Sequence, residues 1–152
     1  MKKLCVIILL IVSSYAAICP CGGAYADEIP ALSDDEIVLI SKAVRLETQG
    51  KSYLSKVCVT AMIFNRIRDS LLPNGVYATV MQKGAFLVAD PDTIRKDVSA
   101  DELEEYTILT ELVYKFGIDP TCGALFIMEE GDPDIELFTV TLKVEGLVFA
   151  KP

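Results

Sequence analysis

The polar and apolar positions after residue 33 alternate with the period of a helix. Four positions separated by three or four residues share one helix face: Ile37, Ile40, Val44 and Glu47. Ser33 and Glu36 form the S-x-x-E pattern of a capping box, and Gly50 is a natural C-terminal stop. We therefore predict a helix between Ser33 and Gly50.

The same signals predict three further helices, over residues 52–69, 76–82 and 99–117. In the first of these the section Val57–Phe64 is apolar nearly all round, which is typical of a helix buried on most sides. The last begins with a second capping-box pattern, formed by Ser99 and Glu102. Residues 84–98 show no regular pattern, and Asp90-Pro91-Asp92 is expected to form a turn.

The last part of the chain changes to the pattern of strands. We predict strands over residues 124–128, 138–144 and 147–150. The middle one alternates strictly, with its apolar side chains at Phe138, Val140, Leu142 and Val144. Glu145-Gly146 is a tight turn, and the acidic residues 129–134 are expected to form a loop. Helices followed by a small antiparallel three-stranded sheet indicate an α+β fold.

The N-terminal segment has the pattern of a secretory signal peptide over residues 1–26. Lys2 and Lys3 precede the apolar run 4–12, and Ala24-Tyr25-Ala26 is an A-x-A cleavage site. The run is shorter than the roughly 20 residues of a membrane span. We predict export, a leader over residues 27–35 and one domain over residues 36–152. An uncleaved anchor, or a lipid attached at Cys19 or Cys21, is the alternative.

The composition limits the partners and catalytic mechanisms that the chain can have. The chain has 152 residues, a net charge of −8 and no histidine. Its acidity argues against nucleic acid as a partner, and the missing histidine excludes a Ser-His-Asp triad and a histidine-ligated zinc. Without histidine, proton transfer near neutral pH falls to carboxylates, Cys, Tyr or Lys. After removal of residues 1–26, Cys58 and Cys122 remain; they either pair in an oxidising compartment or Cys58 is a buried core residue.

Glu47 is the anomaly of the pattern, because it lies on the apolar face of its predicted helix. A glutamate is rarely buried unless it is paired or functional. Burial raises the pKa of a carboxyl group, which can then donate a proton to a glycosidic oxygen. The alternative is a structural side chain that reaches solvent or pairs with Arg45, Lys51 or Arg66.

Several segments resemble the SleB/CwlJ-type cell wall hydrolases, which cleave peptidoglycan and are known from lysis of the spore cortex. Residues 43–50 (AVRLETQG) resemble the family pattern A-V-x-x-E-A-R-G-E. Residues 59–66 (VTAMIFNR) resemble A-A-V-I-L-N-R, and residues 72–82 with Phe86 resemble F-P-x-x-V…V-x-x-x-x-Q-F. Further on, DPTCGALF (119–126) resembles D-P-T-x-G-A-x-Y-F, and KVEGLVF (143–149) resembles K-I-G-x-H-x-F.

This resemblance implies a lysozyme-like fold and a lytic transglycosylase that cuts the bond between N-acetylmuramic acid and N-acetylglucosamine. Glu47 would be its acid and base, and the resemblance implies no metal and no cofactor. Four further residues are candidates for substrate contact: Asn65, Gln82, Phe86 and Thr121. The expected partner is the glycan strand of peptidoglycan. We expect the protein to act on it as a monomer outside the cytoplasm. For each of the four, a structural role in a loop or in the core is the alternative.

The sequence departs from the family pattern near Glu47. Gln49 and Lys51 stand where the pattern has Arg and Glu, Leu87 where Ser is common, and Leu147 where it has His. A cation at residue 51 would lower the pKa of Glu47 unless Gly50 ends the helix and turns Lys51 away. The second hypothesis is therefore a catalytically impaired descendant that serves as a wall-binding or structural module.

Overall fold

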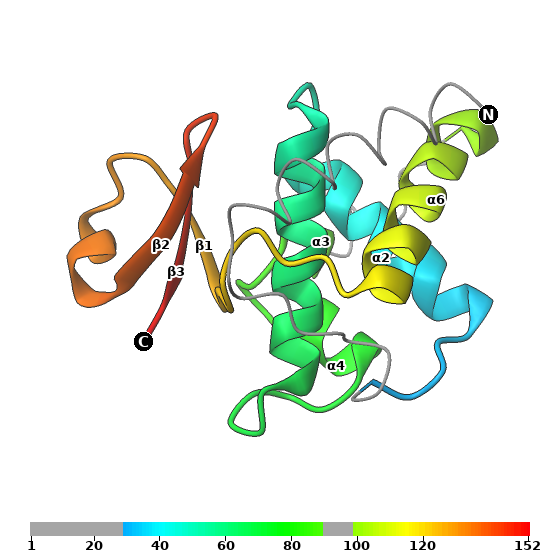
Figure 1. Ribbon diagram of the computed structural model, residues 1–152, viewed down its shortest axis with the longest axis horizontal. Coiled ribbons are helices and arrows are strands. Elements are labelled where there is room, and N and C mark those ends of the chain that lie inside the picture. Colours follow the sequence, from blue (N-terminus) through cyan, green and yellow to red (C-terminus); the bar gives the residue numbers. More distant parts are fainter. Residues whose placement is uncertain (1–28, 90–98) are drawn as a thin grey trace.

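The computed structural model describes residues 29–89 and 99–152. A group of helices lies on one side of the molecule and a small sheet on the other (Figure 1). The helices are α2 (Asp34–Glu47), α3 (Tyr53–Arg68), α4 (Val76–Val80), the short 3-10 helix η2 (Leu87–Ala89) and α6 (Ala100–Phe116). The α+β fold class is confirmed. The predicted signal peptide and the predicted turn at residues 90–92 lie outside the described residues.

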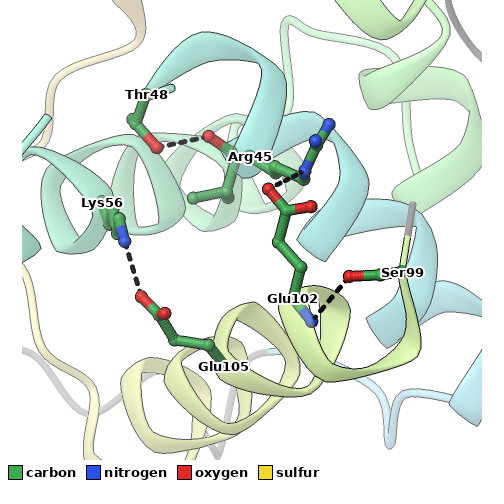
Figure 2. A network of polar contacts seen from close by, with 7 residues as sticks. Arg45, Thr48, Lys56, Ser99, Glu102 and Glu105 are labelled. Carbon is green, nitrogen blue, oxygen red and sulfur yellow. Dashed lines mark hydrogen bonds and ion pairs between the residues drawn. The ribbon is translucent and has the colours of Figure 1, made fainter. Parts of the chain in front are cut away.

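The start of α2 follows the predicted capping box. The Ser33 hydroxyl accepts the Glu36 N–H at 3.3 Å, and the Glu36 carboxylate accepts the Ser33 N–H at 2.9 Å. The second predicted box, at α6, is only half formed. Ser99 accepts the Glu102 N–H at 3.3 Å, but the Glu102 carboxylate turns to Arg45 Nε of α2 at 2.8 Å (Figure 2). A tertiary ion pair thus takes the place of the local bond.

Helix α3 is the centre of the fold. It lies between the sheet and the other long helices in Figure 1, and it contacts α2, α4, α6 and β1. Its residues from Val57 to Ile67 are all buried, as the uniformly apolar stretch predicts. Cys58 is among them, and it forms no disulfide with Cys122. Burial raises the pKa of the Cys58 thiol, with the charge of Asp119 adding to the effect, so this cysteine is an inert core residue.

The sheet contains β1 (Phe126–Glu129), β2 (Thr139–Val144) and β3 (Leu147–Lys151) in the order β1-β3-β2, all antiparallel. The four residues of β3 from Leu147 to Ala150 are buried. The strict alternation predicted for β2 is wrong, because the register shifts between Val140 and Leu142 and leaves Val140 38% exposed. A bulge of this kind turns a side chain away from the core.

The acidic loop predicted before β2 is more ordered than expected. Residues Pro133–Leu137 form the 3-10 helix η3, with Pro133 in its first turn and the Asp132 carboxylate accepting the Asp134 N–H at 2.9 Å. Proline is favoured at that place because its fixed φ suits a helix start. Within residues 29–89 and 99–152, no helix combines the length and apolar character that crossing a membrane requires.

Candidate active site

Glu47 is the last residue of α2, and its side chain is partly buried. Its Oε1 accepts a hydrogen bond from the Leu87 N–H at 2.5 Å, where η2 begins. Burial raises the pKa of Glu47 above the ordinary value of a glutamate, and the Leu87 hydrogen bond opposes that shift in part. The carboxyl group therefore keeps its proton to a higher pH than an ordinary glutamate does.

The three cations that the sequence offered as partners for Glu47 have other partners. Arg45 pairs with Glu102, and Lys51 Nζ donates to the Glu145 carbonyl at 2.9 Å. Arg66 bonds Gln82 and the Leu125 carbonyl, as described next. Among the described residues, no cation forms an ion pair with Glu47. The predicted structural pairing of Glu47 with these three is thus not found.

Arg66 is a buried cation of α3 that contacts several other segments. Its guanidinium donates to Gln82 Oε1 at 2.5 Å and to the Leu125 carbonyl at 2.7 Å. It also lies 5.7 Å from the ring centre of Phe86, a buried residue next to Leu87. Burial lowers the pKa of Arg66 and the charge of Asp69 raises it, yet an arginine stays charged. Arg66 therefore joins α3 to Gln82, Phe86 and β1, rather than forming the ion pair that the sequence suggested.

Asn65 and Thr121 meet around a carboxylate that sequence reasoning missed. Asp119 Oδ1 accepts the Thr121 N–H at 2.8 Å, and Oδ2 accepts the Gly123 N–H at 2.8 Å and Asn65 Nδ2 at 3.1 Å. Asn65 also donates to the Ala124 carbonyl at 3.2 Å, and Thr121 is fully buried. The signal that could have found Asp119 is the D-P-T sequence, since Asp favours a bond to the backbone two residues on.

The five predicted site residues thus fall into two groups. Glu47, Gln82 and Phe86 are linked through the Leu87 N–H and Arg66, while Asn65 and Thr121 surround Asp119. Asn65 directly precedes Arg66 in α3, so one turn of this helix contacts both groups. The polar side chains of Asn65, Gln82 and Thr121 all make hydrogen bonds within the protein. Of the five, Glu47 is the residue with a titratable side chain.

Removal of the Leu87 N–H tests how Glu47 is held. Leu87 is the first residue of η2, where proline fits the backbone. We expect Leu87→Pro to raise the pKa of Glu47 further, because the bond to this N–H stabilises the ionised form. Carbon-detected NMR titration of the carboxyl measures the change. Leu87→Ala keeps the N–H and is the matched control, so an equal shift in both variants would contradict this assignment.

Helices followed by a small antiparallel three-stranded sheet form a lysozyme-like α+β domain. The catalytic domain of the Bacillus cereus SleB protein has the same fold, with a TM-score of 0.67, 25% identity, and coverage of 86% of this chain and 100% of that one. The catalytic domain of the germination-specific lytic transglycosylase SleB from Bacillus anthracis gives a TM-score of 0.66 at 24% identity, over 81% and 99% of the two chains.

Sequence relatives agree with this assignment. The spore cortex-lytic enzyme of Halalkalibacterium halodurans is 31% identical over 102 residues, which are 66% of this chain and 29% of the relative. That of Bacillus subtilis is 30% identical over 104 residues, or 63% and 34%. The chain spans about a third of the length of these relatives. No family model matches the sequence. The chain is similar in sequence and in fold to the SleB/CwlJ-type family, as its ordered motifs predict.

Proposed function

We propose that this chain is a peptidoglycan-cleaving enzyme of the cell wall, a lytic transglycosylase with Glu47 as its general acid and base. Its relatives are named spore cortex-lytic enzymes, which supports the cortex as the substrate. The observation that carries the proposal is the half-buried Glu47, whose pKa burial raises and for which the described residues provide no ion pair. A carboxyl in this state suits proton donation to a leaving oxygen.

Glu47 would act twice in one turnover. The protonated carboxyl gives its proton to the glycosidic oxygen, and the bond from that oxygen to C1 of the muramic acid breaks. The resulting carboxylate then takes the proton of the C6 hydroxyl, whose oxygen bonds to C1 and closes a 1,6-anhydro ring. The proton returns to Glu47, so the reaction consumes no water and needs no second carboxylate, unlike that of glycosidases with two carboxylates.

The products distinguish this reaction from hydrolysis. Purified sacculi, with and without cortex-type muramic acid, are incubated with the protein, and the released muropeptides are identified by mass spectrometry. Anhydro ends support a transglycosylase, while reducing ends would replace it with a hydrolase. Absence of any product from folded protein would contradict the proposal.

A wall-binding module without catalysis is the second candidate. The observation in its favour is that Asn65, Gln82 and Thr121 bond groups within the protein, which leaves fewer groups to hold a sugar in position for proton transfer at Glu47. Such a module would sediment with sacculi and release nothing from them. Sedimentation and product analysis on the same sample therefore separate the two candidates.

We further propose that residues 1–26 direct export, that residues 27–35 form a leader and that residues 36–152 act as a monomeric domain outside the cytoplasm. The supporting pattern is the apolar run between Lys3 and the A-x-A site. N-terminal sequencing of the protein recovered from expressing cells tests the cleavage. An N-terminus at Asp27 is the expected result, and one at Met1 would favour an anchor.

A further inference from the structure

The turn between β2 and β3 holds the beginning of α3. Glu145 Oε2 accepts hydrogen bonds from the Ser52 N–H at 2.8 Å, the Ser52 hydroxyl at 2.9 Å and the Ser55 hydroxyl at 2.6 Å. The Glu145 carbonyl accepts Lys51 Nζ at 2.9 Å. Ser52 is the N-cap residue of α3, but its own side chain makes no capping bond. A carboxylate more than 90 positions away in the sequence therefore caps this helix; we call these four bonds the Glu145 clamp.

The backbone of Glu145 indicates that the clamp is maintained at a cost. Glu145 has φ of 50° and Gly146 has φ of 79°, so two successive residues lie in the left-handed region, as a type I′ turn requires. Glycine or asparagine satisfies that requirement with less strain than glutamate. A side chain that persists in a strained conformation invites a functional explanation.

The clamp acts on the segment that directly follows Glu47. Thr48 is buried and its hydroxyl bonds the Val44 carbonyl at 2.6 Å, while the Lys51 N–H bonds the Thr48 carbonyl at 2.9 Å. We propose that Glu145 is a positioning residue for Glu47: it anchors Lys51 and Ser52 at the start of α3 and thereby keeps the Lys51 ammonium away from the Glu47 carboxyl.

Among the described residues, three cations of α2 and α3 have partners of their own. Arg45 of α2 pairs with Glu102 of α6, and Lys56 of α3 pairs with Glu105 of α6 at 2.5 Å (Figure 2). Arg66 of α3 bonds Gln82 and a carbonyl. Helix α4 and η2 carry no acidic or basic residue, and Tyr77 of α4 is 70% exposed. Lys51 is thus the nearby cation whose place depends on the clamp.

The clamp matters because a cation beside a carboxyl favours the ionised form. If Lys51 swung toward Glu47, the pKa of Glu47 would fall, and fewer molecules would carry the proton that the reaction needs. The activity side of this inference rests on the proposed function. The ionisation of Glu47 does not, since it can be measured without a substrate.

The test is a double-mutant cycle on the full chain between Glu145→Gly and Lys51→Met. Glycine suits the positive φ and removes the three carboxylate bonds to Ser52 and Ser55. The carbonyl that accepts Lys51 remains, but the turn that carries it is no longer tied to α3. We expect Glu145→Gly to lower the pKa of Glu47 in an NMR titration and to move the alkaline limb of kcat to lower pH, with about a tenfold loss of kcat on that limb. Lys51→Met in the Glu145→Gly background should restore both, whereas loss of a merely structural contact would not be reversed.

Two further variants keep the proposal falsifiable if Glu145→Gly does not fold. Glu145→Gln retains an acceptor of equal length and should behave nearly as wild type. The pair Ser52→Ala with Ser55→Ala removes hydroxyl donors and leaves the turn untouched, and it should lower the pKa of Glu47 in the same direction. An unchanged Glu47 pKa in Glu145→Gly or in the Ser52→Ala/Ser55→Ala pair, or no restoration by Lys51→Met, overturns the proposal. If the pKa responds as expected and wild type releases no product, the proposed function fails and the clamp stands.

Discussion

Replacement of Glu47 by glutamine is expected to reduce the release of muropeptides by about 10³-fold, because a positioned general acid and base contributes roughly 10²–10⁴ to rate. The amide is nearly isosteric with the carboxyl group and its oxygen can still accept the Leu87 N–H. The variant therefore loses the transferable proton while keeping the contact. Initial rates on sacculi, measured by mass spectrometry of the products, quantify the loss. Glu136→Gln, at an exposed position of η3, makes the same chemical change elsewhere and should retain full activity.

Glu47→Gln should also be more stable than wild type at alkaline pH. The pKa of Glu47 is raised in the folded protein, so ionisation of this group destabilises the fold as pH rises above its ordinary value. Glutamine removes that cost. The gain in melting temperature should be present at pH 8 and should disappear as pH falls below the ordinary glutamate pKa, where the wild-type carboxyl is neutral as well. A Glu47→Gln protein that is inactive and less stable than wild type at pH 8 would indicate a structural role instead.

Asp119→Ala is expected to lower the free energy of unfolding by about 2–4 kcal/mol, since removal of an acceptor leaves several buried donors unsatisfied. The Asp119 carboxylate accepts from the N–H groups of Thr121 and Gly123, the Thr121 hydroxyl and Asn65 Nδ2. These bonds fix the loop that leads into β1 on the end of α3. Urea unfolding at equilibrium measures the loss.

Two controls separate the acceptor role of Asp119 from a general effect of charge. Asp119→Asn keeps one oxygen acceptor and should lose less stability than Asp119→Ala. Asp134→Ala removes an exposed carboxylate from η3 and should change stability by no more than about 0.5 kcal/mol. Equal losses in all three variants would show that the bonds around Asp119 carry no special weight.

Local signals predicted the helices well. The bonds between Ser33 and Glu36 span three residues, and the apolar run from Val57 follows from its neighbours alone, so both were accessible from the sequence. The capping box predicted at Ser99 is only half formed, because the Glu102 carboxylate pairs with Arg45 of another helix. The bulge in β2 likewise depends on pairing with β3, which periodicity along one strand cannot reveal.

In the candidate site too, the sequence revealed features of a single segment but not contacts between distant segments. Glu47 stood out because a carboxylate occupies an apolar helix face, which is a property of one segment. Its contact is the backbone N–H of Leu87, and a backbone group leaves no mark in the residue code. Asp119 and Glu145 make their bonds to Asn65 and to Ser52 across more than 50 and 90 positions, so their roles emerge only when the fold joins these segments.

The order β1-β3-β2 also sets when the sheet can form. Strand β3 follows β1 and β2 in the sequence, yet it is the strand to which both of them bond. During synthesis, β1 and β2 leave the ribosome with no strand to pair with, and the Glu145 turn closes only after Leu147 and its neighbours have followed. The helices can gather early because their contacts are available earlier, whereas the sheet and its cap on α3 assemble together in a late step.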